Sequence, residues 1–300
     1  MAAPRAVRVS AFAKINLSLR VLGVRADGYH ELRTVFQSIA LHDTLTFRFE
    51  RGPFRLDCSD PACPVDRTNL VWRAAERAWA AGRRRGEPHD VSVRIDKRIP
   101  MAAGLGGGSS DGAAALRVLA SRWNVDQARL PDLAASLGAD VPYFLEGGTV
   151  LGLDRGDLLF PLVDTPASWV TLVMPNFGVS TKDAYGWWDE GRHVGRALSG
   201  PPGGPDRVRP THDHLNDLQA PVAEHHPEIT RIVKALHRAG ASHAAMSGSG
   251  STVLGLFGRR SDAERAARVL GRGDRKVLVT RTVDRAAYGR SGVRRLLQRV

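Results

Sequence analysis

The sequence is poor in cysteine and has no long apolar run. Only two of its 300 residues are cysteines, Cys58 and Cys63, in a stretch rich in Pro and Asp that is typical of a loop. Two thiols without a neighbouring histidine fall short of a zinc site, and so few cysteines argue against a disulfide framework. No stretch could span a bilayer, and Arg5 and Arg8 interrupt the apolar region that a signal peptide needs. We therefore expect a cytoplasmic protein without a membrane partner.

Lysine is also scarce, although the chain is basic. The formal net charge is +12, yet only five of the 43 basic residues are lysines, namely Lys14, Lys97, Lys182, Lys234 and Lys276. Because arginine is preferred along the whole sequence, the charge indicates a coding bias more than a nucleic-acid surface. A lysine that is kept in this background indicates a position where a compact ammonium group is required.

Alternating apolar residues predict a sheet at the start of the chain. Every second residue from Val7 to Val21 is apolar, so Lys14 and Asn16 share the opposite face of this strand. The segment 26–32, ADGYHEL, has the chemistry of a turn. The residues that follow predict strands at 34–41, 43–49 and 90–95, helices at 68–81, 109–123 and 126–137, and a hairpin at 148–162.

The second half of the chain has a different pattern. It starts with a strand at 169–175 and a helix at 180–190, where Ser180 and Asp183 are spaced as a capping box. After a Pro- and Gly-rich loop at 200–210, the pattern predicts a helix at 227–240, two strands of which the second is 251–257, a helix at 261–270 and a strand at 276–283. This β-α-β-β-α-β order is typical of a ferredoxin-like fold. We predict an α+β protein of two domains, residues 1–163 and 164–300.

Residues 100–112, PMAAGLGGGSSDG, place a run of glycines between a strand and a helix. Their spacing differs from that of a P-loop, and no acidic residue follows at the distance that a dinucleotide-binding unit requires. Backbone N–H groups without side chains at a helix N-terminus favour a phosphate anion, and Ser109 and Ser110 supply hydroxyls for phosphate oxygens or Mg²⁺. The alternative is a tight connection whose glycines serve the backbone geometry alone.

Three motifs give the sequence a family resemblance. The glycine segment 100–116, the AKINL strand at 13–17 and the SGSGSTVLGLF segment at 247–257 resemble motifs of the galactokinase, homoserine kinase, mevalonate kinase and phosphomevalonate kinase superfamily. With DGYHEL, LGADVPYF and HLNDLQ, they are similar to the members that phosphorylate the tertiary 2-hydroxyl of a cytidine-diphosphate-linked methylerythritol in the non-mevalonate isoprenoid pathway. The resemblance spans nearly the whole chain and is weakest at 186–210.

The resemblance implies a fold and a reaction. The fold would be an N-terminal ribosomal protein S5 domain 2-like domain and a C-terminal ferredoxin-like domain, with the active site in the cleft between them. ATP is the expected phosphate donor and Mg²⁺ the expected ion, without a dedicated metal-ligating residue. Asp140 matches the catalytic aspartate, whose carboxylate can accept the proton of the hydroxyl. Lys14 matches its partner, whose ammonium group favours the ionised carboxylate.

The resemblance also assigns the binding residues. Tyr29 and His30 are expected to stack on and hydrogen-bond with cytosine, and Tyr185 is the expected second stacking aromatic. The other expected substrate contacts are Asn16, Gly248 and Ser249. The expected ATP contacts are Lys97, Pro100, Gly104, Leu105, Gly106, Gly107, Gly108, Ser109 and Ser110. Asn216 and Asp217 are expected to orient a helix of the second domain and not to touch the substrate.

Two other functions stay open on the sequence alone. A different kinase of the same superfamily, acting on homoserine, mevalonate or another small alcohol, would share the glycine segment and Asp140. A basic RNA-binding module would account for the net charge, but it would not require Asp140 beside a glycine loop.

Overall fold

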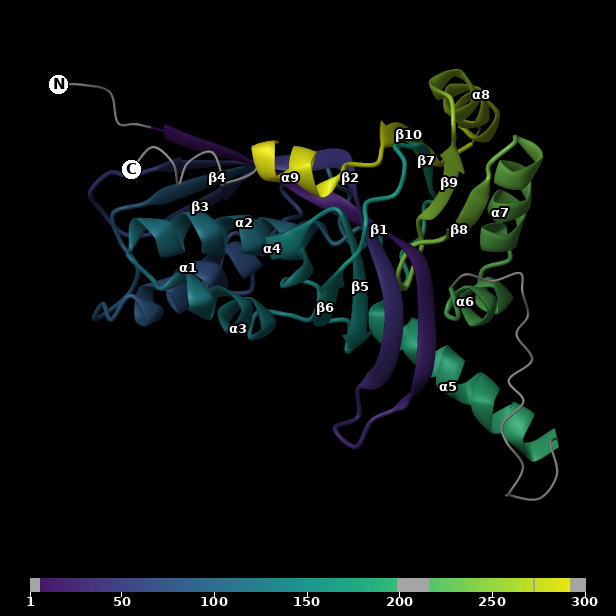
Figure 1. Cartoon of the computed structure of the whole chain (residues 1–300), viewed down its shortest axis with the longest axis horizontal. Helices are drawn as coiled ribbons and strands as arrows, with labels where there is room; N and C mark the ends of the chain where they lie inside the picture. Colours follow the sequence, from purple (N-terminus) through teal and green to yellow (C-terminus); the bar gives the residue numbers. More distant parts are fainter. Residues whose placement is uncertain (1–5, 199–215, 272, 292–300) are drawn as a thin grey trace.

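The computed structural model describes residues 6–198, 216–271 and 273–291. The predicted loop at 200–210 and residues 292–300 of the basic tail lie outside the described residues. In the described part of the chain, two sheets with helices packed on them form two domains. The long strands β1 (Ala6–Val24) and β2 (His30–Arg48) run between these domains (Figure 1).

Strand β2 organises the first sheet. One side of it pairs in antiparallel fashion with β1 over the length of both strands. The other side pairs with β4 through residues 44–48 and with β5 through residues 32–37. Strand β3 then extends the sheet beside β4, and β6 extends it beside β5. The bounds of these strands are β3 (Arg55–Cys58), β4 (Ser92–Asp96), β5 (Thr149–Asp154) and β6 (Leu158–Pro161).

The structure corrects the two strands predicted at 34–41 and 43–49. They form the single strand β2, whose register against β1 shifts between Phe12 and Ala13. A bulge of this kind leaves extra residues outside the ladder without ending the strand. The polar residue Asp43, next to the predicted break, therefore lies inside a continuous strand, where its side chain is fully buried.

Helices on one face of the first sheet enclose its core (Figure 1). Their bounds are α1 (Leu70–Ala81), α2 (Gly107–Arg122), the 3-10 turn η1 (Gln127–Arg129), α3 (Leu130–Ala135) and α4 (Tyr143–Glu146). Helix α2 begins two residues before the predicted start, so that Gly107 and Gly108 belong to the helix. The helix predicted at 126–137 is divided at Leu130, immediately before Pro131. Proline cannot donate a backbone hydrogen bond, which favours a helix start at this point.

The second sheet has the antiparallel strand order β10-β7-β9-β8. This is the order that a β-α-β-β-α-β unit produces, and the predicted two-domain α+β fold is confirmed. The elements are β7 (Trp169–Met174), α5 (Thr181–Leu198), α6 (Gln219–His225), α7 (Glu228–Arg238), β8 (His243–Met246), β9 (Val253–Phe257), α8 (Arg260–Leu270), β10 (Lys276–Arg281) and α9 (Arg285–Ser291). At the start of α5, the Asp183 N–H donates to Ser180 Oγ at 3.0 Å, which is the predicted cap.

The two domains are connected by more than one crossing of the chain. Leu19 of β1 lies in the core of the second domain and forms a bridge with Asn216. After β10 the chain returns to the first domain, where the hydroxyl of Tyr288 in α9 donates to the Phe144 carbonyl at 2.8 Å. The boundary near residue 163 lies between β6 and β7 and stays a prediction, and α9 packs against residues before it.

We predict that Asn216→Ala lowers the free energy of unfolding by about 2–3 kcal/mol, because three buried hydrogen bonds are lost and two carbonyls lose the donor that Asn216 supplies. The buried Asn216 amide donates to the carbonyls of Met246 and Gly248 at 2.8 Å, and its oxygen accepts from the Leu218 N–H before α6 at 2.9 Å. Denaturant unfolding measures the change. The control is the exposed Asn176, whose change to alanine should stay within about 0.5 kcal/mol of wild type. Equal losses in the two variants would contradict the prediction.

Candidate functional site

A cavity of about 1070 Å³ opens between the two domains. Both domains contribute to its wall, the first through β1, β2 and the glycine segment and the second through α5 and the turn after β8. All of the predicted site residues except Ser110 line this cavity. They are Lys14, Asn16, Tyr29, His30, Lys97, Pro100, Gly104, Leu105, Gly106, Gly107, Gly108, Ser109, Asp140, Tyr185, Gly248 and Ser249.

The first turn of α2 faces the cavity with backbone donors that have no acceptor. Within the described residues, the N–H groups of Gly107, Gly108 and Ser109 make no hydrogen bond, whereas the N–H of Ser110 donates to Gly106 O at 2.9 Å. The helix also has no side-chain cap. A helix start whose donors and partial positive charge are left open toward a cavity favours an anion at that place.

Two glycines allow the loop before α2 to lie where it does. A Cβ atom on Gly104 would be 2.3 Å from the Ser247 carbonyl oxygen, so only glycine permits the loop to approach the turn after β8. Gly106 has a φ of 69°, in the left-handed region, and a Cβ there would be 2.7 Å from the Phe144 ring. In contrast, nothing lies within 4 Å of a Cβ on Gly108. The protein itself therefore does not require a glycine at position 108.

The structure argues against the predicted contact of Ser110 with phosphate. Its side chain is buried, and its hydroxyl donates to the Phe12 carbonyl of β1 at 2.7 Å. Ser110 thus attaches the first turn of α2 to the sheet. Ser109, which is partly exposed and lines the cavity, is the serine that remains available to a ligand.

Lys14 and Asp140 meet at the cavity. The Lys14 ammonium lies 3.5 Å from Asp140 Oδ2, and it donates to Asn16 Oδ1 at 2.9 Å. Asn16 in turn donates to Thr34 Oγ1 at 2.7 Å. The backbone N–H of Lys14 also donates to the carbonyl of Leu105 at 3.0 Å. One residue of β1 therefore contacts both the carboxylate and the glycine loop.

The burial of this pair is uneven. The Lys14 side chain is 5% exposed, and that of Asp140 is 38% exposed. The lysine is held in place by its surroundings, while the carboxylate remains open to the cavity. The accessible carboxylate of Asp140 can therefore accept a hydrogen bond from a ligand hydroxyl, with the buried Lys14 ammonium beside it.

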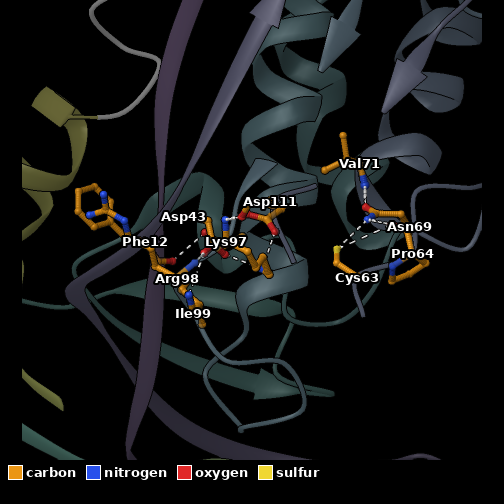
Figure 2. A network of polar contacts seen from close by, with 12 residues as sticks. Phe12, Asp43, Cys63, Pro64, Asn69, Val71, Lys97, Arg98, Ile99 and Asp111 are labelled. Carbon is orange, nitrogen blue, oxygen red and sulfur yellow. Dashed lines mark hydrogen bonds and ion pairs between the residues drawn. The ribbon is translucent and has the colours of Figure 1, made fainter. Parts of the chain in front are cut away.

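Lys97 lines the cavity, but its ammonium is engaged by two buried carboxylates. Lys97 Nζ donates to Asp43 Oδ2 at 2.5 Å and to Asp111 Oδ2 at 2.7 Å (Figure 2). Asp43 Oδ1 also accepts the backbone N–H groups of Arg98 and Ile99. The network joins the residues that precede the glycine loop to the first turns of α2, which follow it.

The charges of this network influence one another. Burial alone would lower the pKa of Lys97, but the two carboxylates outweigh it and raise that pKa. Burial raises the pKa of Asp111, Lys97 opposes this effect, and the second carboxylate Asp43 adds to it. In the part of the chain that the structure describes, Asp111 Oδ1 is buried and has no hydrogen-bond partner. Removing the ammonium that the two carboxylates share would destabilise the folded protein, because it would leave two like charges close together and away from water.

Tyr29, His30 and Tyr185 lie together in one part of the cavity wall, which we call the aromatic end of the cavity. The Tyr185 ring of α5 packs on the His30 ring with 4.4 Å between the centroids. Tyr29 is 56% exposed, and the Arg155 guanidinium lies 5.3 Å from the centre of its ring. Burial raises the pKa of the Tyr185 hydroxyl, and the charge of Asp140 raises it further. The predicted cytosine-binding residues are therefore close to one another and to the predicted catalytic carboxylate.

Several wall residues were not predicted from the sequence, namely Asp111, Arg155, Lys182 and Asp189. Asp111 belongs to the same SSDG segment as the predicted serines, so its position in the motif is a usable signal. Asp189 lies four residues after Tyr185 on α5, a spacing that puts both side chains on one helix face. Arg155 and Lys182 carry no comparable signal, because a surface arginine or lysine is common in any chain.

Among the described residues, no group of three or more His, Cys, Asp or Glu side chains is placed to hold a metal ion. Cys58 and Cys63 are both free thiols. None of the described helices combines the length and the apolar character that crossing a bilayer requires.

The sequence matches two family models, the GHMP kinases N terminal domain over residues 69–148 and the GHMP kinases C terminal domain over residues 210–274. It is 43% identical to 4-diphosphocytidyl-2-C-methyl-D-erythritol kinase of Solibacter usitatus, over 97% of this chain and 94% of the relative. It is likewise 43% identical to the enzyme of that name from Pelotomaculum thermopropionicum, over 90% of this chain and 96% of the relative. The chain belongs to the 4-diphosphocytidyl-2-C-methyl-D-erythritol kinase family.

Solved structures agree with this family. A crystal structure of 4-(cytidine 5'-diphospho)-2C-methyl-D-erythritol kinase superposes with a TM-score of 0.70 and 34% identity, covering 92% of this chain and all of the other. Homoserine kinase from Cytophaga hutchinsonii has a TM-score of 0.64 at 19% identity, covering 95% and 96% of the two chains, and shares the fold. As a member of the GHMP kinases, this protein is a small-molecule kinase with ATP as the phosphate donor.

We predict that Lys97→Met lowers the free energy of unfolding by about 3–5 kcal/mol, because it leaves Asp43 and Asp111 without their shared counter-ion. Thermal or denaturant unfolding measures this change. If Lys97 acted only as a nucleotide contact, the variant would raise the KM for ATP and leave the stability unchanged. That result would contradict the structural role of the network.

We predict that Gly108→Ala raises the KM for ATP by about 10-fold or more, because the added methyl group occupies space that only a ligand uses. The same change should leave the folded state intact and raise its stability by up to about 1 kcal/mol, since alanine favours a helix. Steady-state kinetics and unfolding curves test the two effects.

A matched control for this variant is Gly191→Ala on α5. Gly191 is exposed, no described atom lies within 4 Å of its added Cβ, and it is not part of the cavity wall. The control should change stability in the same direction and leave the KM for ATP as in wild type. An unchanged KM in both variants would argue against phosphate at this helix start.

Proposed function

We propose that this protein transfers the γ-phosphoryl group of ATP to the 2-hydroxyl of 4-diphosphocytidyl-2-C-methyl-D-erythritol. The single observation that carries the proposal is the presence, in one cavity, of three open backbone donors at the start of α2 and of the Lys14–Asp140 pair. The names of the relatives support the choice of acceptor.

The open amides of α2 are proposed to hold the phosphates of ATP. Phosphoryl transfer involves little covalent chemistry on the protein, so positioning and charge neutralisation account for most of the catalysis. The donors of Gly107, Gly108 and Ser109 lie together in the first turn of α2, at the positive end of the helix. Their glycine-rich surroundings allow phosphate oxygens to approach the backbone closely.

Asp140 is proposed to orient the acceptor hydroxyl and to accept its proton as the new P–O bond forms, while the bond from the γ-phosphorus to the bridging oxygen breaks and ADP leaves. The half-exposed carboxylate is accessible to a substrate, and the Lys14 ammonium lies 3.5 Å from it. As charge moves onto the transferring phosphoryl oxygens, the Lys14 ammonium offers a fixed positive charge nearby. Asn16 and Thr34 hold this ammonium in place through their chain of hydrogen bonds.

Mg²⁺ is proposed to accompany ATP without a protein cage. Mg²⁺ commonly takes most of its ligands from substrate phosphates and water, with one or two oxygens from the protein. Ser109 is a side chain of the predicted site whose oxygen could complete the shell of the ion from the cavity wall. When bound, the ion neutralises part of the negative charge of the phosphates.

The cytidine part of the acceptor is proposed to bind at the aromatic end of the cavity, at Tyr29, His30 and Tyr185. These side chains offer flat faces for stacking and an imidazole for hydrogen bonds with the base edge. We further propose that the protein acts in the cytoplasm on small molecules and has no nucleic-acid partner.

Kinase assays with a panel of acceptors test the proposed function. The purified protein should phosphorylate 4-diphosphocytidyl-2-C-methyl-D-erythritol with a kcat/KM at least about 100-fold above those for homoserine and mevalonate. A higher kcat/KM for mevalonate or homoserine would instead identify the protein as a different kinase of the superfamily. RNA binding that survives moderate salt, together with an absence of ATP turnover, would favour the RNA-binding alternative.

We predict that Asp140→Asn lowers kcat by about 10²–10⁴-fold, because the amide keeps the size of the side chain but cannot accept the proton of the hydroxyl. The dissociation constant for an ATP analogue should stay within about two-fold of wild type, because the proposed phosphate donors are untouched. Asp132→Asn on α3, an exposed position outside the cavity wall, serves as the control. A kcat near the wild-type value would remove Asp140 from the mechanism.

A further inference from the structure

Asp189 contacts the histidine at the aromatic end of the cavity. Asp189 Oδ1 lies 3.0 Å from His30 Nε2, so the contact joins α5 of the second domain to the first residue of β2. Both residues line the cavity. The sequence separation of 159 residues explains why the pattern of the chain does not predict this pair.

The imidazole of His30 is held from several sides. Tyr185, one helical turn before Asp189, packs on the face of the ring at 4.4 Å. Trp188 meets it edge-on with 5.6 Å between the centroids. The His30 side chain is 13% exposed. The ring therefore has little freedom to rotate, and its two nitrogens keep separate environments.

The contact fixes which nitrogen carries the proton. A carboxylate only accepts hydrogen bonds, so His30 Nε2 must be the donor toward Asp189. In the neutral imidazole the other nitrogen, Nδ1, is then an acceptor. Within the described residues, the contact with Asp189 through Nε2 is the one hydrogen bond found for the His30 side chain. An acceptor without a partner remains available to a ligand in the cavity.

We propose that Asp189 is a positioning residue that sets the base specificity of the acceptor site by holding His30 with the proton on Nε2. The inference rests on the proposed function, in which His30 meets the base of a nucleoside diphosphate. An acceptor nitrogen matches the exocyclic amino group of cytosine, which donates. It does not match the carbonyl oxygen at the same position of uracil, which only accepts, and two acceptors in contact repel each other.

The substitution Asp189→Asn tests this role. The amide of asparagine can accept from Nε2–H or donate to Nε2, so it permits either tautomer and lets Nδ1 become a donor. The measurement is kcat/KM for the cytidine-diphosphate-linked acceptor and for its uridine-diphosphate analogue. We expect the cytidine-to-uridine ratio to fall by about 10-fold, mainly through KM for the acceptor, while KM for ATP stays unchanged.

Two controls separate this role from a general loss of structure. Glu190→Gln changes the neighbouring exposed carboxylate on α5 and should leave the ratio as in wild type. Asp189→Glu keeps the acceptor charge and should restore part of the selectivity. In a His30→Ala background, Asp189→Asn should have no further effect on the ratio, because the residue acts through His30.

The experiment distinguishes a failure of the inference about Asp189 from a failure of the proposed kinase function. If the wild type strongly prefers the cytidine acceptor and Asp189→Asn keeps that preference within about two-fold, the inference is overturned and the proposed function stands. If the wild type phosphorylates neither nucleotide acceptor, both are overturned. A loss of selectivity in Glu190→Gln equal to that in Asp189→Asn would also contradict the role of Asp189.

Discussion

The close packing of the glycine loop against the turn after β8 is the constraint on which the site depends. At Gly104 the backbone of one domain comes so near the Ser247 carbonyl of the other that no side chain fits between them. The Ser247 hydroxyl donates to the Gly104 carbonyl at 3.1 Å in the same contact. The loop is thereby fixed between the domains, and α2 starts with open donors at the wall of the cavity.

The same contact links the two halves of the proposed reaction. Leu105, next to Gly104, accepts the backbone N–H of Lys14, whose ammonium faces Asp140. Below the loop, the buried Asp43–Lys97–Asp111 network ties its two ends together. A displacement of the loop would therefore move both the phosphate donors and the lysine beside the carboxylate. This explains how a backbone segment with almost no side chains can be held firmly enough for catalysis.

Local patterns were sufficient to predict much of the fold. The alternation in β1, the amphipathic period of α7 and the cap at Ser180 depend on neighbours in sequence, and the structure has each of them. The continuity of β2 was missed because Asp43, with Lys97 as its partner 54 residues away, is polar in sequence but buried in the sheet. Strand propensity depends on a residue and its neighbours in sequence, so it does not include a counter-ion that is distant in sequence.

The candidate site likewise contains residues that sequence motifs reveal and contacts that only the structure shows. The glycine segment and Asp140 could be located because they belong to motifs, and the structure brings them to one cavity. The engagement of Lys97 by two carboxylates and the contact of Asp189 with His30 depend on tertiary packing, which no spacing reveals. For Ser110 the motif suggests a contact with phosphate, whereas in the structure its hydroxyl donates to the Phe12 carbonyl of the neighbouring strand β1.

The most direct measurement of the central claim is a crystal structure of the protein with a non-hydrolysable ATP analogue and 4-diphosphocytidyl-2-C-methyl-D-erythritol bound together. The account predicts phosphate oxygens within hydrogen-bond distance of the Gly107, Gly108 and Ser109 amides, and the 2-hydroxyl of the acceptor on the Asp140 carboxylate. Phosphates bound away from the start of α2, or an acceptor hydroxyl out of reach of Asp140, would contradict it.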